Sequence, residues 1–149
     1  MKKILLIAIA ALIIVGCSKK NTPTPAINLK VAIVGTWIAK ADTEVITKDG
    51  AYWHTYPIPG YISLTFKSDG TGTRVWDDGP RNFTYTIADN KITFNYQRID
   101  NPDGSYGPAF TETLDVKTIT GNGLILIYQD DVTQDGSLYH TIETQQFSK

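Results

Sequence analysis

The stretch Gly35-Thr36-Trp37 opens the first expected strand, residues 34–46, and decides how the rest of the chain is interpreted. A glycine at position 35 allows two stretches of backbone to approach closely. Trp37 carries a large apolar ring that can close one end of a barrel, and its indole N–H then needs an acceptor. We therefore expect Trp37 to lie buried at one end of a β-structure.

After residue 34 the sequence alternates apolar and polar residues in short runs, which is the period of β-strands, and no stretch has a convincing helical period. Turn pairs such as Asp69-Gly70, Asp89-Asn90 and Asp135-Gly136 separate the runs and favour tight hairpins. The pattern predicts strands at residues 34–46, 61–67, 72–77, 82–88, 91–98, 110–118, 123–129 and 138–147.

Because tight hairpins join neighbours in the sequence, the predicted fold is all-β, an eight-stranded antiparallel up-and-down meander barrel. A two-sheet sandwich is the alternative. The side chains expected to point inward are Ile62, Leu64, Phe66, Phe83, Tyr85, Ile87, Phe94 and Tyr96.

The opening Gly35-x-Trp37, followed by antiparallel strands, resembles lipocalin-like (calycin) barrels, in particular the small lipocalin-like domains of bacterial lipoproteins. These two residues match the first lipocalin motif. The Asp-Tyr pair of the second motif has no counterpart, and the last strand lacks the Arg that the third motif places over the tryptophan. The C-terminal helix of the larger lipocalins is also missing. The minimal bacterial type is therefore a better match than the classical ligand-carrying lipocalins. The interior of such an eight-stranded barrel holds either side chains or one small ligand.

The first residues have the pattern of a secretory leader. Lys2 and Lys3 precede an uncharged apolar run at residues 4–15, which is too short for a membrane span. Gly16-Cys17 then resembles the lipobox of bacterial lipoproteins, where the peptide is cut before the cysteine and its thiol receives fatty acyl chains such as palmitate. Two or three acyl chains give stable anchoring. The alternative is an ordinary signal peptide with a chance cysteine.

This resemblance divides the chain into a lipoprotein signal peptide (1–16), a lipidated Cys17 with an extended tether (17–30), and the barrel domain (31–149). The tether is polar and interrupted by prolines. Lys19-Lys20 follow the cysteine in place of the acidic run that sends some lipoproteins to the cell surface. We therefore expect a lipid-anchored protein of the bacterial cell envelope, in the outer membrane and facing the periplasm.

The connection expected at residues 47–60 is long and carries Trp53 and Tyr56. In lipocalin-like barrels the first connection often folds over the open mouth, so the resemblance implies a lid over an apolar ligand. The alternative is that these rings simply plug the barrel end. Chain reversal at each hairpin places the connections after the first, third and fifth strands at one end. Trp76 and Tyr106 join the same mouth by this parity, which makes Trp53, Tyr56, Trp76 and Tyr106 the candidate ligand-binding residues.

Other kinds of site have little support in the sequence. A net charge of -1 without a basic cluster argues against nucleic-acid binding. His54 and His140 have no paired spacing and Cys17 is assigned to lipidation, so no metal site or cofactor is expected. The turn at residues 100–104 faintly resembles a calcium loop but lacks its alternating oxygen ligands and closing Glu. No nucleophile elbow is present, and we expect no enzymatic activity.

Two functions therefore stay open. In the first, the tethered barrel binds a small apolar or amphipathic ligand at its mouth. In the second, a filled barrel is a protein-interaction module that docks an envelope partner. The bulky inward residues favour the second function, whereas the lid-like first connection favours the first, which we place ahead.

Overall fold

The computed structural model describes residues 27–149 except 59 and 101–105, so the predicted signal peptide and Cys17 lie outside the described residues. No helix in this part of the chain is long and apolar enough to cross a membrane. The elements, in chain order, are α2 (Leu29–Ala32), β1 (Gly35–Lys48), β2 (Ala51–Pro57), β3 (Tyr61–Phe66), β4 (Thr71–Trp76), β5 (Gly79–Ala88), β6 (Lys91–Tyr96), β7 (Ile99–Asp100), β8 (Tyr106–Gly107), β9 (Phe110–Ile119), β10 (Gly123–Gln134) and β11 (Ser137–Ser148).

Eight of these strands form a closed antiparallel barrel in the order β1-β3-β4-β5-β6-β9-β10-β11, and β11 pairs with β1 to close it. The predicted meander is confirmed, and closure excludes the two-sheet sandwich. Tight turns join the neighbours as expected: Asp89 and Asn90 both have positive φ (49° and 60°), which suits the two-residue hairpin between β5 and β6.

Trp37 closes one end of the barrel, as the sequence predicts. Its side chain is 0% exposed, and the indole N–H donates to the carbonyl oxygen of Ile33 at 2.7 Å. The ammonium of Lys149 lies 4.3 Å from the centre of the indole and donates to the Val34 carbonyl at 2.9 Å. A cation therefore covers the tryptophan even though the last strand has no Arg. Gly35 has φ +129°, and a Cβ there would stand 3.0 Å from the Lys149 side chain.

Helix α2 leads into this closed end. Leu29 and Lys30, which the sequence assigns to the extended tether, form its first residues, and Leu29 packs against the core. A helix of four residues is too short to produce a helical period in the sequence. The chain thus enters the barrel beside Trp37.

The apolar core fills the interior of the barrel around Trp37. Gly72 provides room for it, because a Cβ at this position would stand 2.3 Å from the ring of Phe83. The prediction that Ile62 points inward is wrong, because its side chain is 53% exposed. An irregularity of the β3–β4 pairing between Tyr61 and Ser63 shifts the register at this residue. The buried core residues are Ile33, Trp37, Leu64, Phe66, Phe83, Ile92, Phe94, Tyr96, Leu114, Leu124, Leu126 and Phe147.

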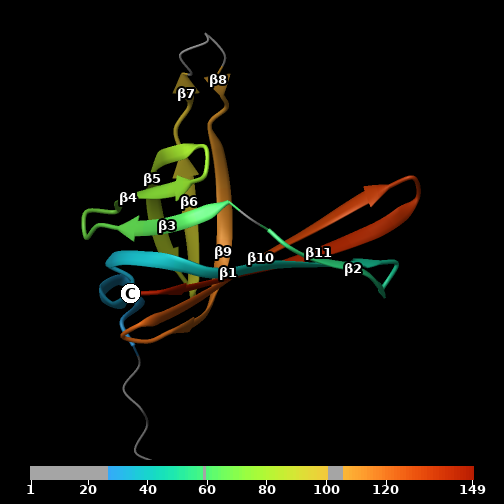
Figure 1. The fold of residues 1–149 in the computed structure, drawn as a ribbon, viewed down its shortest axis with the longest axis horizontal. Helices are drawn as coiled ribbons and strands as arrows, with labels where there is room; N and C mark the ends of the chain where they lie inside the picture. Colours follow the sequence, from blue (N-terminus) through green and yellow to red (C-terminus); the bar gives the residue numbers. More distant parts are fainter. Residues whose placement is uncertain (1–26, 59, 101–105) are drawn as a thin grey trace, which may run out of the picture.

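Beyond the barrel, four strands continue as a projecting arm in the order β10-β11-β1-β2 (Figure 1). The arm consists of β2 with residues 43–48 of β1, 128–134 of β10 and 137–144 of β11. The sequence predicts a loop at residues 47–60, yet Asp49 and Gly50 form a two-residue turn with positive φ and return the chain as strand β2. Most of the connection predicted at residues 47–60 is therefore the second strand of a hairpin with β1.

Candidate functional site

The open end of the barrel, opposite Trp37, gathers the longest connections. The chain leaves β1, β4 and β6 at this end, as the predicted parity requires, and the β10–β11 hairpin also projects from it. The segments at the open end accordingly include Trp53, Tyr56, Trp76 and the backbone of Tyr106. The Tyr106 backbone pairs with Asp100 in the β7–β8 ribbon.

The predicted rings divide between two clusters at this end. Trp53 packs edge-on against Tyr139 on the arm, with ring centres 5.1 Å apart, and Tyr56 lies 4.8 Å from the ring of His54. Trp76 belongs to the barrel wall, where its ring lies 5.6 Å from that of Tyr96. The side chain of Tyr106 lies outside the described residues. Trp53 and Tyr56 thus form an aromatic platform on the arm, with Trp76 in a separate cluster.

The inner face of the barrel continues onto the arm along β11. The register of β11 with β10 is unbroken from Gly123 to Gln134, so alternate residues of β11 share one face. From the barrel outward that face carries Phe147, Gln145, Glu143, Thr141 and Tyr139. Because Trp53 packs on Tyr139, the aromatic platform lies on this inner face.

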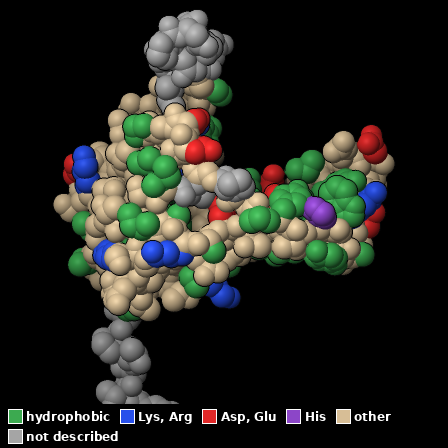
Figure 2. Space-filling view, viewed as in Figure 1, with side chains coloured by type: hydrophobic (Ala, Val, Ile, Leu, Met, Phe, Trp, Pro, Cys, Tyr) green, Lys and Arg blue, Asp and Glu red, His purple; other side chains and the backbone are tan. Residues whose placement is uncertain are grey.

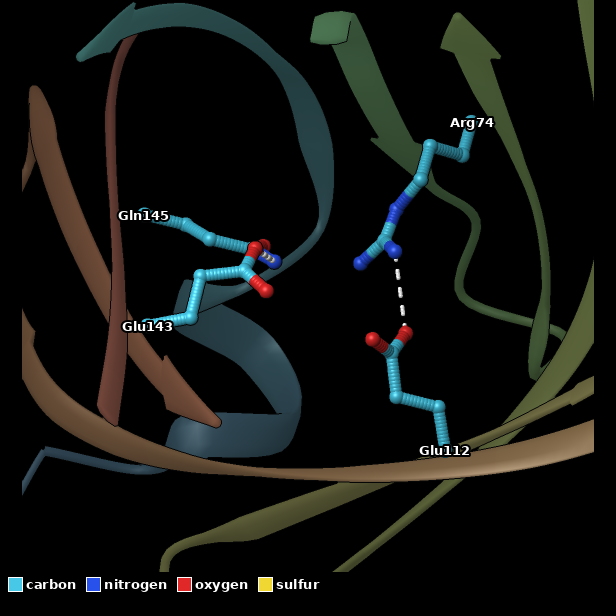
Figure 3. A network of polar contacts seen from close by, with 4 residues as sticks. All are labelled: Arg74, Glu112, Glu143 and Gln145. Carbon is cyan, nitrogen blue, oxygen red and sulfur yellow. Dashed lines mark hydrogen bonds and ion pairs between the residues drawn. The ribbon is translucent and has the colours of Figure 1, made fainter. Parts of the chain in front are cut away.

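A polar cluster lies between the apolar core and the arm. It consists of Asp42 (β1), Arg74 (β4), Glu112 (β9), Glu143 and Gln145 (both β11). Arg74 is 1% exposed and donates from Nη1 to Glu112 Oε2 at 2.9 Å. The Gln145 side-chain amide donates to Glu143 Oε1 at 2.6 Å. Figure 3 shows these four side chains of β4, β9 and β11 pointing toward one another inside the barrel.

Aromatic rings support the guanidinium of Arg74. Its carbon lies 5.0 Å from the ring centre of Phe94, 5.2 Å from Trp76 and 5.6 Å from Tyr96. Such cation–π contacts stabilise a charge that has left water. Trp76 therefore contributes to the site by holding Arg74.

The polar cluster holds more acidic than basic side chains, and its interior opposes their ionisation. Burial and the neighbouring Glu143 carboxylate raise the pKa of Asp42 to about 8, so this carboxyl is protonated at neutral pH. Burial and the carboxylates of Asp130, Glu112 and Glu143 raise the pKa of Tyr128, whose phenol lies beside the cluster. Glu112 and Glu143 then face a single guanidinium. Buried charges are expensive to maintain and concentrate at functional sites.

A groove of about 470 Å³ reaches the polar cluster from outside. Strand β1 pairs with β3 over Gly35–Ile38 and with β2 from Thr43 onward. The groove lies between these two pairings, where β1 separates from β3. It is lined by residues 39–43 of β1 and by Pro57, Ile58 and Gly60. Asp42 thus belongs both to the groove and to the interior cluster.

Sequence reasoning missed every member of the polar cluster. The signal was present in the phase of the strands: Glu143 and Gln145 share the inward phase of Phe147, and Arg74 shares that of Gly72. Charged residues in an inward phase mark a polar interior. Among the described residues no group of three or more His, Cys, Asp or Glu is placed to hold a metal ion.

The family model described as a lipocalin-like domain matches residues 33–126. The chain belongs to the lipocalin-like domain family. The match includes Trp37, Asp42, Arg74 and Glu112 but ends before β11. Among solved structures, an uncharacterized protein from Bacteroides eggerthii DSM 20697 is 12% identical, with a TM-score of 0.39, and the match covers 74% of this chain and 98% of that chain. No curated protein matches.

Proposed function

We propose that this lipocalin-like protein is a lipid-anchored binding protein of the bacterial cell envelope that holds a small amphipathic molecule at the open end of its barrel. One observation carries the proposal: the inner face of β11 changes from the apolar Phe147, through Gln145 and Glu143, to the ring of Tyr139. A surface graded in this way matches a molecule with one polar and one apolar end.

The polar end of the ligand would meet the polar cluster. A barrel that needed only stability could fill this space with apolar side chains, because replacing a buried ion pair with well-packed apolar residues is often neutral or stabilising. Here Arg74, Glu143 and Gln145 present both donors and acceptors to the interior. Such a set suits a head group that itself both donates and accepts hydrogen bonds.

The apolar part of the ligand would lie on the aromatic platform. Trp53 is 54% exposed although it packs on Tyr139, and the space-filling view shows hydrophobic side chains gathered along the arm (Figure 2). Exposed apolar patches of this kind mark binding surfaces. Cys17 would keep the protein at the membrane, where amphipathic molecules concentrate.

Native mass spectrometry of the full-length lipidated protein, purified from its own host in a mild detergent, tests the proposal. We expect a reproducible adduct that Trp53→Ala removes. Tyr52→Ala is the matched control: Tyr52 is an exposed ring on the same strand, but it pairs with Thr47 and so lies on the outer face of the arm. Glu143→Gln should weaken the adduct while leaving Trp53 in place.

A bare mass for the unsubstituted protein, together with no thermal stabilisation by a panel of lipids and amphipathic sugars, would reject ligand binding. The same outcome would favour the second candidate function, docking of an envelope protein. The exposed arm is the feature that supports that function.

A further inference from the structure

Strand β2 forms an open edge of the arm. Among the described residues it stands at the end of the nine-stranded sheet and pairs with β1 alone. Every residue of β2 except Tyr56 is exposed. An edge strand of this kind presents unpaired backbone N–H and C=O groups to another extended strand.

The two edges of the arm differ in charge. Edge strands in natural proteins are usually protected by charged side chains. Residues 128–134 of β10 form the other edge and carry Asp130 and Asp131, whereas β2 has no Asp, Glu, Lys or Arg. The β2 edge instead exposes two rings, Tyr52 at 70% and Trp53 at 54%. The β2 edge therefore lacks charged protection, and what protects it is its terminal Pro57 and its irregular pairing with β1 between Ile46 and Thr47.

We propose that β2 pairs antiparallel with β2 of a second copy of this chain, so that the two arms join into one eight-stranded sheet. An antiparallel pair of identical strands is related by a two-fold axis, and the interface is therefore closed and self-complementary. Pairing of β2 with the β10 edge of another copy would instead produce an open chain of molecules. It would also place the uncharged strand beside the carboxylates of Asp130 and Asp131. A neutral strand repels its own copy least.

The area available sets the strength of this dimer. The rings of Tyr52 and Trp53 from both copies could cover about 500 Å² at most, on the basis of ~200 Å² for each aromatic side chain and their exposed fractions. This is well below the roughly 1,200 Å² that marks the lower bound of a stable interface, and the strand backbones must supply the rest of the buried area. The dimer is therefore expected to be weak and to depend on protein concentration. The dimer does not require a bound ligand, although its interface shares Trp53 with the aromatic platform.

Cysteine cross-linking in membranes of cells that produce the full chain tests the pairing. Single substitutions Tyr52→Cys, His54→Cys and Thr55→Cys place a thiol along β2, and Thr133→Cys places one on the exposed β10 edge as the matched control. We expect a homodimer on a non-reducing gel for the β2 position nearest the two-fold axis and none for Thr133→Cys. The unsubstituted protein reports any cross-linking through Cys17.

Absence of a homodimer at all three β2 positions would overturn the proposal, as would equal cross-linking at Thr133. A cross-link from β2 to a different protein would also overturn it, because the partner would then not be a second copy.

A lysine at the edge provides a second, independent measurement. Thr55→Lys introduces a charge into β2, and Thr133→Lys introduces the same charge into the other edge. By sedimentation of the detergent-solubilised protein over a range of concentrations, we expect Thr55→Lys to weaken the dimer at least tenfold and Thr133→Lys to leave it unchanged. Both variants should retain the ligand adduct, which separates this proposal from the proposed function. Equal effects of the two lysines, or none, would reject β2 as the interface.

Discussion

Asp42 lies at the point where the groove meets the polar cluster, and its protonation links stability to pH. Burial and the charge of Glu143 raise the pKa of its carboxyl from the ordinary value of 3.8 to about 8 in the folded protein. Between these values the folded state binds more protons than the unfolded state. The contribution of Asp42 to stability is therefore largest below pH 3.8 and is lost as the pH rises toward 8.

We predict that Asp42→Asn is more stable than the natural protein at pH 8.5, by about 1–2 kcal/mol, and that the difference disappears near pH 4. Each pH unit contributes up to ~1.4 kcal/mol, reduced here because the carboxyl is only half-buried. Urea unfolding at pH 4.5, 6.5 and 8.5 measures the difference. Glu143→Gln removes the charge that raises the pKa of Asp42 and should flatten the pH dependence. Parallel pH curves for the natural protein and Asp42→Asn would contradict this account.

Single residues also show which features of the structure the sequence can predict. Burial of Trp37 follows from its place after Gly35 and from the size of its ring, and it is confirmed. The sequence has no Arg on its last strand and therefore gives no sign of a cation over Trp37. Lys149 supplies that cation, but the alternation of residues along a strand does not predict where such a long, flexible side chain ends. Ile62 fails for a related reason, since a local irregularity in strand pairing leaves no pattern in the sequence.

At the scale of elements, the arm is the main departure from the sequence prediction. Prolines and clustered aromatics at residues 52–59 suggest a loop, but aromatic and β-branched residues also favour cross-strand pairing. Val45 pairs with Thr55 on one side and Ile142 on the other, which extends β1 beyond the barrel. The eight barrel strands were predictable because tight turns fix their order. The polar cluster was not, because its members come from four strands (β1, β4, β9 and β11) that only closure of the barrel brings together.

We predict that β2 is the least protected strand of the arm against amide hydrogen exchange. Its residues are exposed and it has one neighbouring strand, so opening it breaks few apolar contacts. Its amides should exchange through local opening at about 0–2 kcal/mol, whereas β5 and β6, which carry Phe83 and Phe94, should require close to global unfolding. The measurement uses Thr55→Lys, in which the proposed dimer is weakened. Equal protection of β2 and β6 in that variant would contradict the prediction.

The whole molecule has two ends with different properties. The closed end holds Trp37 and receives the chain from helix α2, whereas the open end carries the polar cluster and the groove. The arm also projects from the open end (Figure 1). The 11 residues between Cys17 and Leu29 could span at most about 40 Å if fully extended. A lipid anchor at Cys17 would therefore attach through the closed end and leave the open end unobstructed by the tether.

Lipidation at Cys17 is the prediction on which this arrangement rests. Cells fed an alkyne-tagged palmitate should label the natural protein, and Cys17→Ser should abolish the label, because serine lacks the thiol that accepts the acyl-bearing group. The variant should also keep its leader and migrate as a larger precursor, since the peptide is cut only before a lipidated cysteine. Ser18→Ala is the neighbouring control and should be labelled and processed normally. An unlabelled natural protein that has nevertheless lost its leader would identify an ordinary signal peptide, and the barrel would then be released from the membrane rather than held within about 40 Å of it.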